Sequence, residues 1–172
     1  IPLDNMGNAA LKRALDIVGS LVLLILTSPV ILVSMLIIKI TMGGNVIFRQ
    51  KRVGLNKKVF TMYKLKSMRD SAVSDTAWST DADPRRTKFG AFIRKFSIDE
   101  LPQLINILKG DMSFVGPRPE RPEIAQKYEK TMPEFKYRLK VKAGLTGYAQ
   151  VMGKYNTTPY DKLKLDLMYI EH

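Results

Sequence analysis

The chain contains no cysteine, and its single histidine, His172, is the last of its 172 residues. Without cysteine there is no disulfide framework and no thiolate to act as a nucleophile or metal ligand. One terminal histidine, to which we assign no role, leaves no Cys/His zinc cluster and no Ser-His-Asp triad. These classes of site are excluded, and the absence of cysteine suits a reducing compartment.

Acidic residues are few relative to basic ones. Lys and Arg total 28 against 16 Asp and Glu, which gives a net charge of +12. This excess favours anionic partners, namely nucleic acid, an acidic membrane surface or phosphorylated substrates. The length is enough for one domain, residues 1–172, with a core of its own. Because the chain begins with Ile1 rather than Met, we expect it to be a fragment of a longer protein.

Charge is absent from Ile17 to Ile38, a run of 22 residues that as a helix is long enough to cross a bilayer. Ser28-Pro29 lies in its middle. Proline lacks a backbone donor and clashes with the preceding turn, so the helix should bend or break there, and Ser28 could donate to a freed carbonyl. A secretory signal fits poorly, because the run is long, no A-x-A-like site follows and the next flank is basic.

Both flanks of this run are basic: Lys12 and Arg13 precede it, and Lys39, Arg49, Lys51 and Arg52 follow it. Short positive flanks prefer the cytoplasm, and a straight crossing would place one of them outside. A helix broken at Ser28-Pro29 can instead enter the bilayer and return. We therefore predict a re-entrant membrane helix over residues 11–40 and a part on the cytoplasmic face over residues 41–172. A proline-kinked spanning helix is the alternative.

Beyond the membrane segment the pattern predicts one β-hairpin and then helices. VIFRQKRVGLNKKVFTMYKLKSM is typical of two strands joined by a turn at Gly54-Leu55-Asn56. A polar, loop-like stretch from Arg69 to Asp83 contains the lone Trp78. From Thr87 the spacing i, i+3, i+4, i+7 predicts a basic amphipathic helix, which can face the core or a membrane surface. Its apolar stripe is Phe89, Phe92, Ile93 and Phe96.

Three further helices are expected. One opens at Ser97 and stops at Gly110, a short one covers residues 124–129, and the last is capped by Thr158 with Pro159 at its first position. Their apolar residues include Leu101, Leu104, Ile105 and Leu108 in the first, and Tyr160, Leu163, Leu167 and Ile170 in the last. The predicted fold class is mainly α with a small β-hairpin element (α+β).

The carboxylate pair Asp99-Glu100 has two interpretations. Ser97 and Glu100 match the S-x-x-E capping box, and acidic residues are favourable in a first helical turn. Alternatively, with Arg94, Lys95 and Arg118 in the neighbourhood, the pair could hold Mg²⁺ and meet an anionic substrate. One carboxylate could also attack phosphorus as a nucleophile.

Several cations and glycines offer further candidates. Pro117-Arg118-Pro119 fixes an arginine between two residues of restricted φ, which suits bidentate phosphate contact but also describes a rigid turn with a solvated arginine. Lys64 and Lys66 alternate along an expected strand and so share one face. The glycines of KAGLTGYAQVMGK could let backbone amides approach a phosphate, although most glycine loops are simply turns.

Read together, FSIDELPQLINILKGDMSFVGPRPE resembles the signature of the bacterial sugar transferase family, monotopic phosphoglycosyl transferases that start glycan assembly on polyprenyl phosphate. The resemblance runs from about Leu11 to Glu171. It includes LKRALDIVGS, the Ser-Pro break, RQKRVG, YKLKSM, DPRRTKFGAFIRK and GLTGYAQV. A motif this long, in this order, is highly specific.

This resemblance implies a re-entrant helix and interfacial amphipathic helices at the cytoplasmic face of a bacterial inner membrane, with Mg²⁺ as cofactor. Asp99 would attack the sugar-bearing phosphate of a UDP-sugar and release UMP, and polyprenyl (undecaprenyl) phosphate would then take the phosphosugar. Glu100, together with Asp99, would bind Mg²⁺. Arg94 and Arg118 match family arginines that contact phosphate or nucleotide, and Lys64 lies in the family's basic strand. The reaction would be the first membrane step of exopolysaccharide, capsule or other surface-glycan assembly.

Three positions depart from the commonest family pattern: Lys66 stands where Arg is usual, Ala143 where Pro is usual and Tyr148 where Trp is usual. Since none touches the carboxylate pair, they bear on substrate detail rather than on the reaction. We expect no nucleic-acid partner, while oligomeric state and the sugar (glucose, galactose or an N-acetylated hexose) stay open. Two other classes also remain: a non-catalytic membrane-anchored module that binds anionic lipid or nucleic acid, and a conventional glycosyltransferase that releases UDP.

Overall fold

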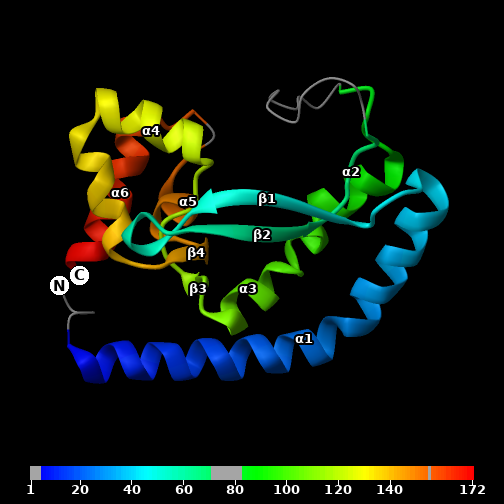
Figure 1. The fold of residues 1–172 in the computed structure, drawn as a ribbon, viewed down its shortest axis with the longest axis horizontal. Coiled ribbons are helices and arrows are strands. Elements are labelled where there is room, and N and C mark those ends of the chain that lie inside the picture. Colours follow the sequence, from blue (N-terminus) through cyan, green and yellow to red (C-terminus); the bar gives the residue numbers. More distant parts are fainter. Residues whose placement is uncertain (1–4, 71–82, 155) are drawn as a thin grey trace.

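The computed structural model describes residues 5–70, 83–154 and 156–172. This part of the chain is mainly helical with two small two-stranded sheets, so the predicted α+β class is confirmed with one sheet more than expected. Figure 1 shows a long N-terminal helix along one edge, a β-hairpin across the middle and C-terminal helices grouped near the two termini. Trp78 and most of the expected polar loop lie outside the described residues.

The first helix, α1 (Met6–Met42), is continuous through the Ser-Pro pair. Figure 1 shows that it bends in its second half, where the chain turns toward α2. Ser28 Oγ donates to Ile25 O at 2.8 Å, and Ile25 is the residue whose carbonyl Pro29 cannot satisfy. Of the predicted bend or break, the break is wrong, because the helix is continuous through Ser28-Pro29 and only bends in that half, and Ser28 compensates the carbonyl left without a donor. The re-entrant topology itself stays a prediction.

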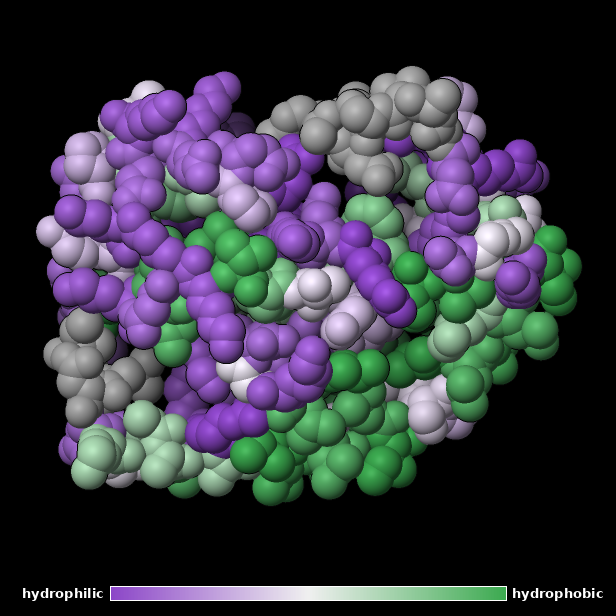
Figure 2. Space-filling model, viewed as in Figure 1, coloured by the Kyte–Doolittle hydropathy of each residue, from purple (hydrophilic) through white to green (hydrophobic). Residues whose placement is uncertain are grey.

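Most of the surface of α1 is apolar and exposed. Of its apolar 18-residue window only 11% is buried, and among the described residues it is the one helix long and apolar enough to cross a membrane, by length and composition. Figure 2 shows this apolar surface along the lower and right-hand edges of the molecule, beside a largely hydrophilic remainder. Exposed apolar area on this scale marks an interaction surface, which suits a helix that lies in lipid.

The N-terminal part of α1 is fixed to the rest of the protein by polar contacts. Arg13 donates to the carbonyls of Ile107 at 2.6 Å and Leu108 at 2.7 Å, which belong to the last turn of α3 (Gln103–Lys109). Asp16 is buried and accepts from Ser113 Oγ at 2.7 Å. Arg13 thus binds two carbonyls at the C-terminal end of α3, of which that of Ile107 also accepts from Gly110 N at 3.1 Å. This basic flank therefore has a structural role besides any membrane role.

The central hairpin consists of β1 (Ile47–Val53) and β2 (Val59–Leu65), which pair antiparallel with Gln50 opposite Met62. The turn η2 (Leu55–Lys57) closes it, with Asn56 in the left-handed region at φ 54°. This confirms the predicted hairpin. Its buried face packs on α3, since Phe60 and Met62 of β2 share a core cluster with residues of that helix.

A second sheet, which the sequence analysis did not predict, pairs β3 (Met112–Val115) in parallel with β4 (Ala143–Thr146). The glycine-rich segment here packs directly on the Gly116 backbone. A Cβ on Gly144 would lie 2.1 Å from Gly116 N, and Gly144 N itself donates to Pro117 O at 2.9 Å. The amide of Gly144 is therefore used within the protein, and this glycine serves close backbone packing rather than phosphate approach.

The C-terminal half forms a compact group of short helices: α4 (Pro122–Thr131), η4 (Pro133–Lys140), α5 (Tyr148–Met152) and α6 (Pro159–Glu171). Ala125, Phe135 and Leu163 form its core together with Val53 of the hairpin. Thr158 caps α6 as predicted, because its Oγ1 accepts from Asp161 N at 3.2 Å.

The helix α2 (Lys88–Lys95) has one apolar side packed in the core and another exposed on the surface. Ile93 is fully buried with Ile38 of α1 and Leu65 of β2, whereas Phe92 is 50% exposed and Phe96 is exposed as well. The predicted apolar stripe is therefore divided between the two alternatives. In the next helix, α3, Ile107 rather than Ile105 is buried, because a 3₁₀ turn precedes α3 and changes the face it presents.

Candidate active site

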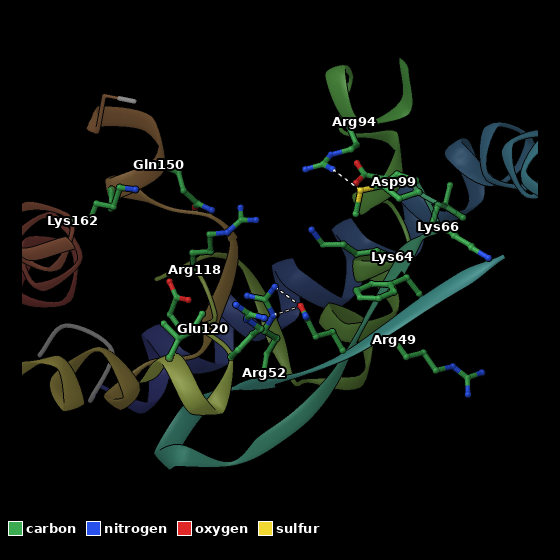
Figure 3. Close-up of a pocket in the computed structure, with 18 of the residues that line it drawn as sticks. Arg49, Arg52, Lys64, Lys66, Arg94, Asp99, Arg118, Glu120, Gln150 and Lys162 are labelled. Carbon is green, nitrogen blue, oxygen red and sulfur yellow. Dashed lines mark hydrogen bonds between the residues drawn. The ribbon is translucent and has the colours of Figure 1, made fainter. Parts of the chain in front are cut away.

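A cavity of about 1450 Å³ opens between the hairpin, the 3₁₀ turn η3 (Ile98–Glu100), the Pro-Arg-Pro turn and helices α5 and α6. Its described lining contains twelve Lys and Arg residues against four Asp and Glu. Figure 3 shows Arg94, Lys64, Lys66 and Asp99 toward one end and Gln150 and Lys162 toward the other, with Arg118 between them. A concave site with this charge suits a ligand that carries several negative charges.

The backbone before the carboxylate pair is strained. Ser97 has φ 56°, a left-handed conformation that non-glycine residues rarely adopt and that clusters at functional sites. Its side chain makes no capping hydrogen bond. The capping-box interpretation is therefore wrong: the pair lies in one 3₁₀ turn between α2 and α3, and its carboxylates are available for other contacts.

Asp99 lies in the wall of the cavity with only 7% of its surface exposed. Burial raises the pKa of its carboxyl, while the positive charges of Lys64 and Arg94 act in the opposite direction. A carboxylate held here is poorly hydrated and faces a basic cavity, which is the environment expected of a nucleophile for an anionic phosphate.

Glu100 points to a different set of partners. Its Oε1 lies 3.3 Å from Lys64 Nζ and 3.8 Å from Arg118 Nη2. The adjacent carboxylates thus diverge, since Asp99 lines the cavity and Glu100 joins the β2 lysine to the Pro-Arg-Pro turn. Burial lowers the pKa of Lys64, with Glu100 opposing that shift.

The structure brings all five predicted site residues to this region. Lys64, Arg94, Asp99 and Arg118 line the cavity, and Glu100 contacts two of them. Arg94 Nη1 lies 3.8 Å from Met68 Sδ, and the Arg118 side chain is about half exposed. Ser28 and Pro29 lie instead in α1, away from the cavity lining.

The three departures from the family pattern fall in different environments. Lys66 lines the cavity and pairs with Asp70 at 2.6 Å, Ala143 is buried in β4, and Tyr148 lies exposed at the start of α5. Only Lys66 is therefore placed to meet a ligand in this cavity.

Sequence reasoning missed several cavity residues, among them Arg52, Arg138, Gln150, Lys162 and Asp166. Arg52 lies in the RQKRVG segment, two residues after Gln50 in the predicted strand. Residues at this spacing share one face of a strand, and this pattern could have indicated a polar face at the site. The others lie on helices whose patterns look like ordinary solvated faces, so nothing local marks them.

The two carboxylates could bind a metal ion only together with other ligands. Within the described residues there is no cluster of three or more His, Cys, Asp or Glu that could hold an ion alone. Mg²⁺ is commonly bound through one or two carboxylates together with substrate phosphates. Two adjacent carboxylates beside a basic cavity fit that second arrangement, in which Asp99 and Glu100 would be the protein donors.

Comparison with known proteins identifies the family. The family model described as bacterial sugar transferase matches residues 7–172. The chain is 41% identical over 162 residues to the uncharacterized sugar transferase EpsL of Bacillus subtilis. This match covers 94% of this chain and 78% of that protein. The chain therefore belongs to the bacterial sugar transferase family, and the predicted enzyme class, phosphoglycosyl transferase, is confirmed.

Two larger relatives carry more specific names. One is the UDP-N-acetylgalactosamine-undecaprenyl-phosphate N-acetylgalactosaminephosphotransferase of Aeromonas hydrophila, 39% identical over 168 residues. The other is the UDP-glucose:undecaprenyl-phosphate glucose-1-phosphate transferase of Escherichia coli, 42% identical over 172 residues. Each match covers 95% of this chain but only 40% and 36%, respectively, of the relative.

Proposed function

We propose that this protein transfers a sugar-1-phosphate from a UDP-sugar to polyprenyl phosphate, in bacteria undecaprenyl phosphate, and releases UMP. The observation that carries the proposal is the position of Asp99: a buried carboxyl in a basic cavity, on a protein that also exposes a long apolar helix. The names of the relatives, which pair UDP-sugars with undecaprenyl phosphate, support the same substrate classes. The product would begin the assembly of a surface glycan such as an exopolysaccharide or capsule.

In the first half-reaction, a carboxylate oxygen of Asp99 attacks the sugar-bearing phosphorus of the donor. A bond forms between this oxygen and phosphorus, the bond to the bridging oxygen breaks, and UMP leaves with that oxygen and its electron pair. Lys64, Arg94 and Arg118 hold phosphate oxygens and offset their charge in the cavity. Attack needs Asp99 in its ionised form.

In the second half-reaction, a phosphate oxygen of the polyprenyl acceptor attacks the same phosphorus. The phosphosugar leaves Asp99, whose carboxylate is regenerated, and the product is a polyprenyl diphosphate sugar. An acceptor this hydrophobic stays in the bilayer, which accounts for a catalytic part attached to a membrane helix. Both substrates are anionic, in agreement with a net charge of +12.

Asp99 and Glu100 are the residues that would hold Mg²⁺, and the ion, when bound, supplies positive charge next to the donor phosphates. Lys64 holds the Glu100 carboxylate in place at 3.3 Å.

We further propose that α1 enters the membrane and returns, so that both of its ends and the cavity face the cytoplasm. Support comes from the two basic flanks and from the bend in the second half of α1, the half that contains Pro29.

Mass spectrometry of the protein incubated with a UDP-sugar, Mg²⁺ and no acceptor tests the mechanism. We expect a phosphosugar adduct on Asp99 and release of one UMP per protein. Asp99→Asn should abolish both by removing the attacking oxygen anion, whereas Glu100→Gln should slow the reaction and still place any adduct on Asp99. An adduct on Glu100, or normal turnover by Asp99→Asn, would contradict the mechanism. Release of UDP would indicate a conventional glycosyltransferase, and absence of any nucleotide product across a panel of UDP-sugars would indicate a binding module.

A further inference from the structure

Two arginines hold the backbone on either side of the Arg118 side chain. Arg138 Nη2 donates to the carbonyl oxygen of Arg118 at 2.8 Å, and Arg52 Nη1 donates to that of Pro119, also at 2.8 Å. The Pro-Arg-Pro segment is thus hydrogen-bonded at two successive carbonyls by side chains from η4 and β1. Hydrogen bonds from a charged donor are among the stronger ones in proteins, so these contacts fix where the turn lies.

Arg138 is itself held rigidly. Its Nε donates to Asp166 Oδ2 of α6 at 2.7 Å, and the two side chains are only 7% and 4% exposed. The guanidinium also lies 4.7 Å from the ring centroid of Phe135. A continuous series of contacts therefore runs from α6 through Asp166 and Arg138 to the backbone of Arg118.

This buried ion pair is poorly explained by stability alone. Removing two charges from water costs several kcal/mol per ion, and replacing a buried pair by apolar residues of similar size is often neutral or stabilising. What an aspartate-arginine pair adds is direction, because the planar guanidinium presents its donors in a fixed geometry. Here one edge meets Asp166 and another donor meets the Arg118 carbonyl.

In the Pro-Arg-Pro segment, the position of the backbone determines the position of the Arg118 side chain. Arg118 stands between Pro117 and Pro119, whose rings fix φ at both neighbours, so its side chain has little backbone freedom of its own. That side chain is about half exposed in the cavity and reaches to 3.8 Å from Glu100. A shift of the Arg118 carbonyl would therefore move the guanidinium away from the place where a donor phosphate is expected.

We propose that Arg138, oriented by Asp166, is a positioning residue that sets the place of the Arg118 guanidinium for the donor phosphates. The inference rests on the proposed function, in which Arg118 contacts the UDP-sugar. It assigns α6 a part in donor binding through Asp166, which lies on the side of this helix that lines the cavity.

A double-mutant cycle on the KM for the UDP-sugar tests this. Arg118→Met should raise KM at least tenfold, and Arg138→Met should raise it several-fold, both with smaller effects on kcat. If Arg138 acts through Arg118, the double variant should show the KM of Arg118→Met alone, because no further contact is left to misplace. Multiplication of the two effects would overturn the positioning role.

A rescue experiment separates positioning from stability. Arg138→Met leaves Asp166 buried without its partner and should lower Tm, whereas Arg138→Met/Asp166→Leu removes both charges and should restore much of it. The KM should stay raised in this restored variant. Recovery of KM together with Tm would assign the pair a purely structural role and overturn the proposal. If Arg138→Met does not fold, the rescued variant takes its place in the cycle.

Ile170→Ala is the matched control on α6. Ile170 is buried in the same helix and does not line the cavity, so its truncation should lower Tm and leave KM unchanged below the unfolding temperature. A raised KM in this control would mean that any loosening of α6 weakens donor binding. That result would contradict a specific role of Asp166 and Arg138 in positioning Arg118. An unchanged KM in Arg118→Met would remove the proposed donor contact itself, whereas failure of the cycle alone leaves the transfer reaction standing.

Discussion

At the scale of single residues, the site is defined by how differently two adjacent carboxylates are placed. Asp99 is buried in the cavity wall, and its pKa is raised by burial. Glu100 is neutralised by Lys64 and Arg118. A one-residue step in a 3₁₀ turn rotates the side chain by roughly 120°, which accounts for the different partners of the two carboxylates.

Lys64 should set the pH at which Asp99 becomes active. Its positive charge favours the ionised carboxyl and so lowers the Asp99 pKa against the effect of burial. Lys64→Met should therefore raise that pKa, and the acid limb of UMP release without acceptor should move to higher pH. The measurement is the single-turnover rate between pH 4.5 and pH 8. Lys66→Met is the control, because Lys66 lines the same cavity but pairs with Asp70. An equal displacement of the acid limb in both variants would contradict the prediction.

At the scale of helices, α1 and α2 both combine an exposed apolar surface with a fixed attachment to the core. In α1 a polar attachment lies near the N-terminal end, through Arg13 and Asp16, and an apolar one lies near the C-terminal end, through the fully buried Ile38. In α2 the attachment is the fully buried Ile93, with Phe92 and Phe96 directed outward. Both helices therefore present apolar residues to the surroundings while their positions stay defined.

The topology of α1 can be tested by cysteine labelling, since the chain has no cysteine of its own. With Asn8→Cys or Asn45→Cys, a membrane-impermeant thiol reagent added to intact cells should label neither position, and both should react after the membrane is opened. Pro29→Ala restores a backbone donor and removes a clash, so it should shift molecules toward a spanning form. Labelling of one position from outside in the original sequence would establish a spanning helix.

The two faces of α2 should respond in opposite ways to the same change. Phe92→Ser should weaken binding of the protein to liposomes severalfold and lower Tm little, because that side chain is half exposed. Ile93→Ser, one position further, should cost on the order of 3 kcal/mol of unfolding free energy, since it opens a cavity and buries a hydroxyl. Sedimentation with liposomes and thermal unfolding give the two readouts. Loss of stability without loss of binding in Phe92→Ser would place this residue functionally in the core.

At the scale of the whole molecule, α1 and the cavity are joined through α3. This helix begins just after the carboxylate pair, and its last carbonyls receive the Arg13 guanidinium. Asp16 adds a second junction at β3, where Phe114 N also donates to it at 3.3 Å. In the proposed membrane-bound form, the depth of α1 in the bilayer would thereby be linked to the position of the turn that carries Asp99.

Asp16→Ala should weaken this junction. It leaves Ser113 Oγ and the Phe114 amide without their acceptor in a buried place, and we expect a loss of about 2–3 kcal/mol of unfolding free energy. Denaturant unfolding in detergent micelles measures the effect. The control is Glu129→Ala, which removes an exposed ion pair with Lys57 and should cost less than about 1 kcal/mol. Similar losses in both variants would mean that Asp16 does not hold α1 to β3.

The sequence by itself determined the features that depend on near neighbours along the chain. The hairpin, the Thr158 cap, the Gly110 stop and the serine that compensates Pro29 were all predicted, because each rests on backbone preferences within one or two turns. The five site residues were found through the family motif, which orders them along the chain. The predicted break at Ser28-Pro29 failed because a helix can continue through a proline when its freed carbonyl finds another donor.

Only the tertiary structure decided which distant groups meet. The parallel pairing of β3 with β4, the Lys64–Glu100–Arg118 contacts and the Asp166–Arg138 support behind Arg118 join segments that no local pattern connects. The same holds for Ile93 and Phe92, whose identical apolar character gives no sign of which one is buried. Burial and charge pairing are properties of the packed molecule, so only the structure shows that Asp99 lines the cavity while Glu100 beside it contacts Lys64 and Arg118.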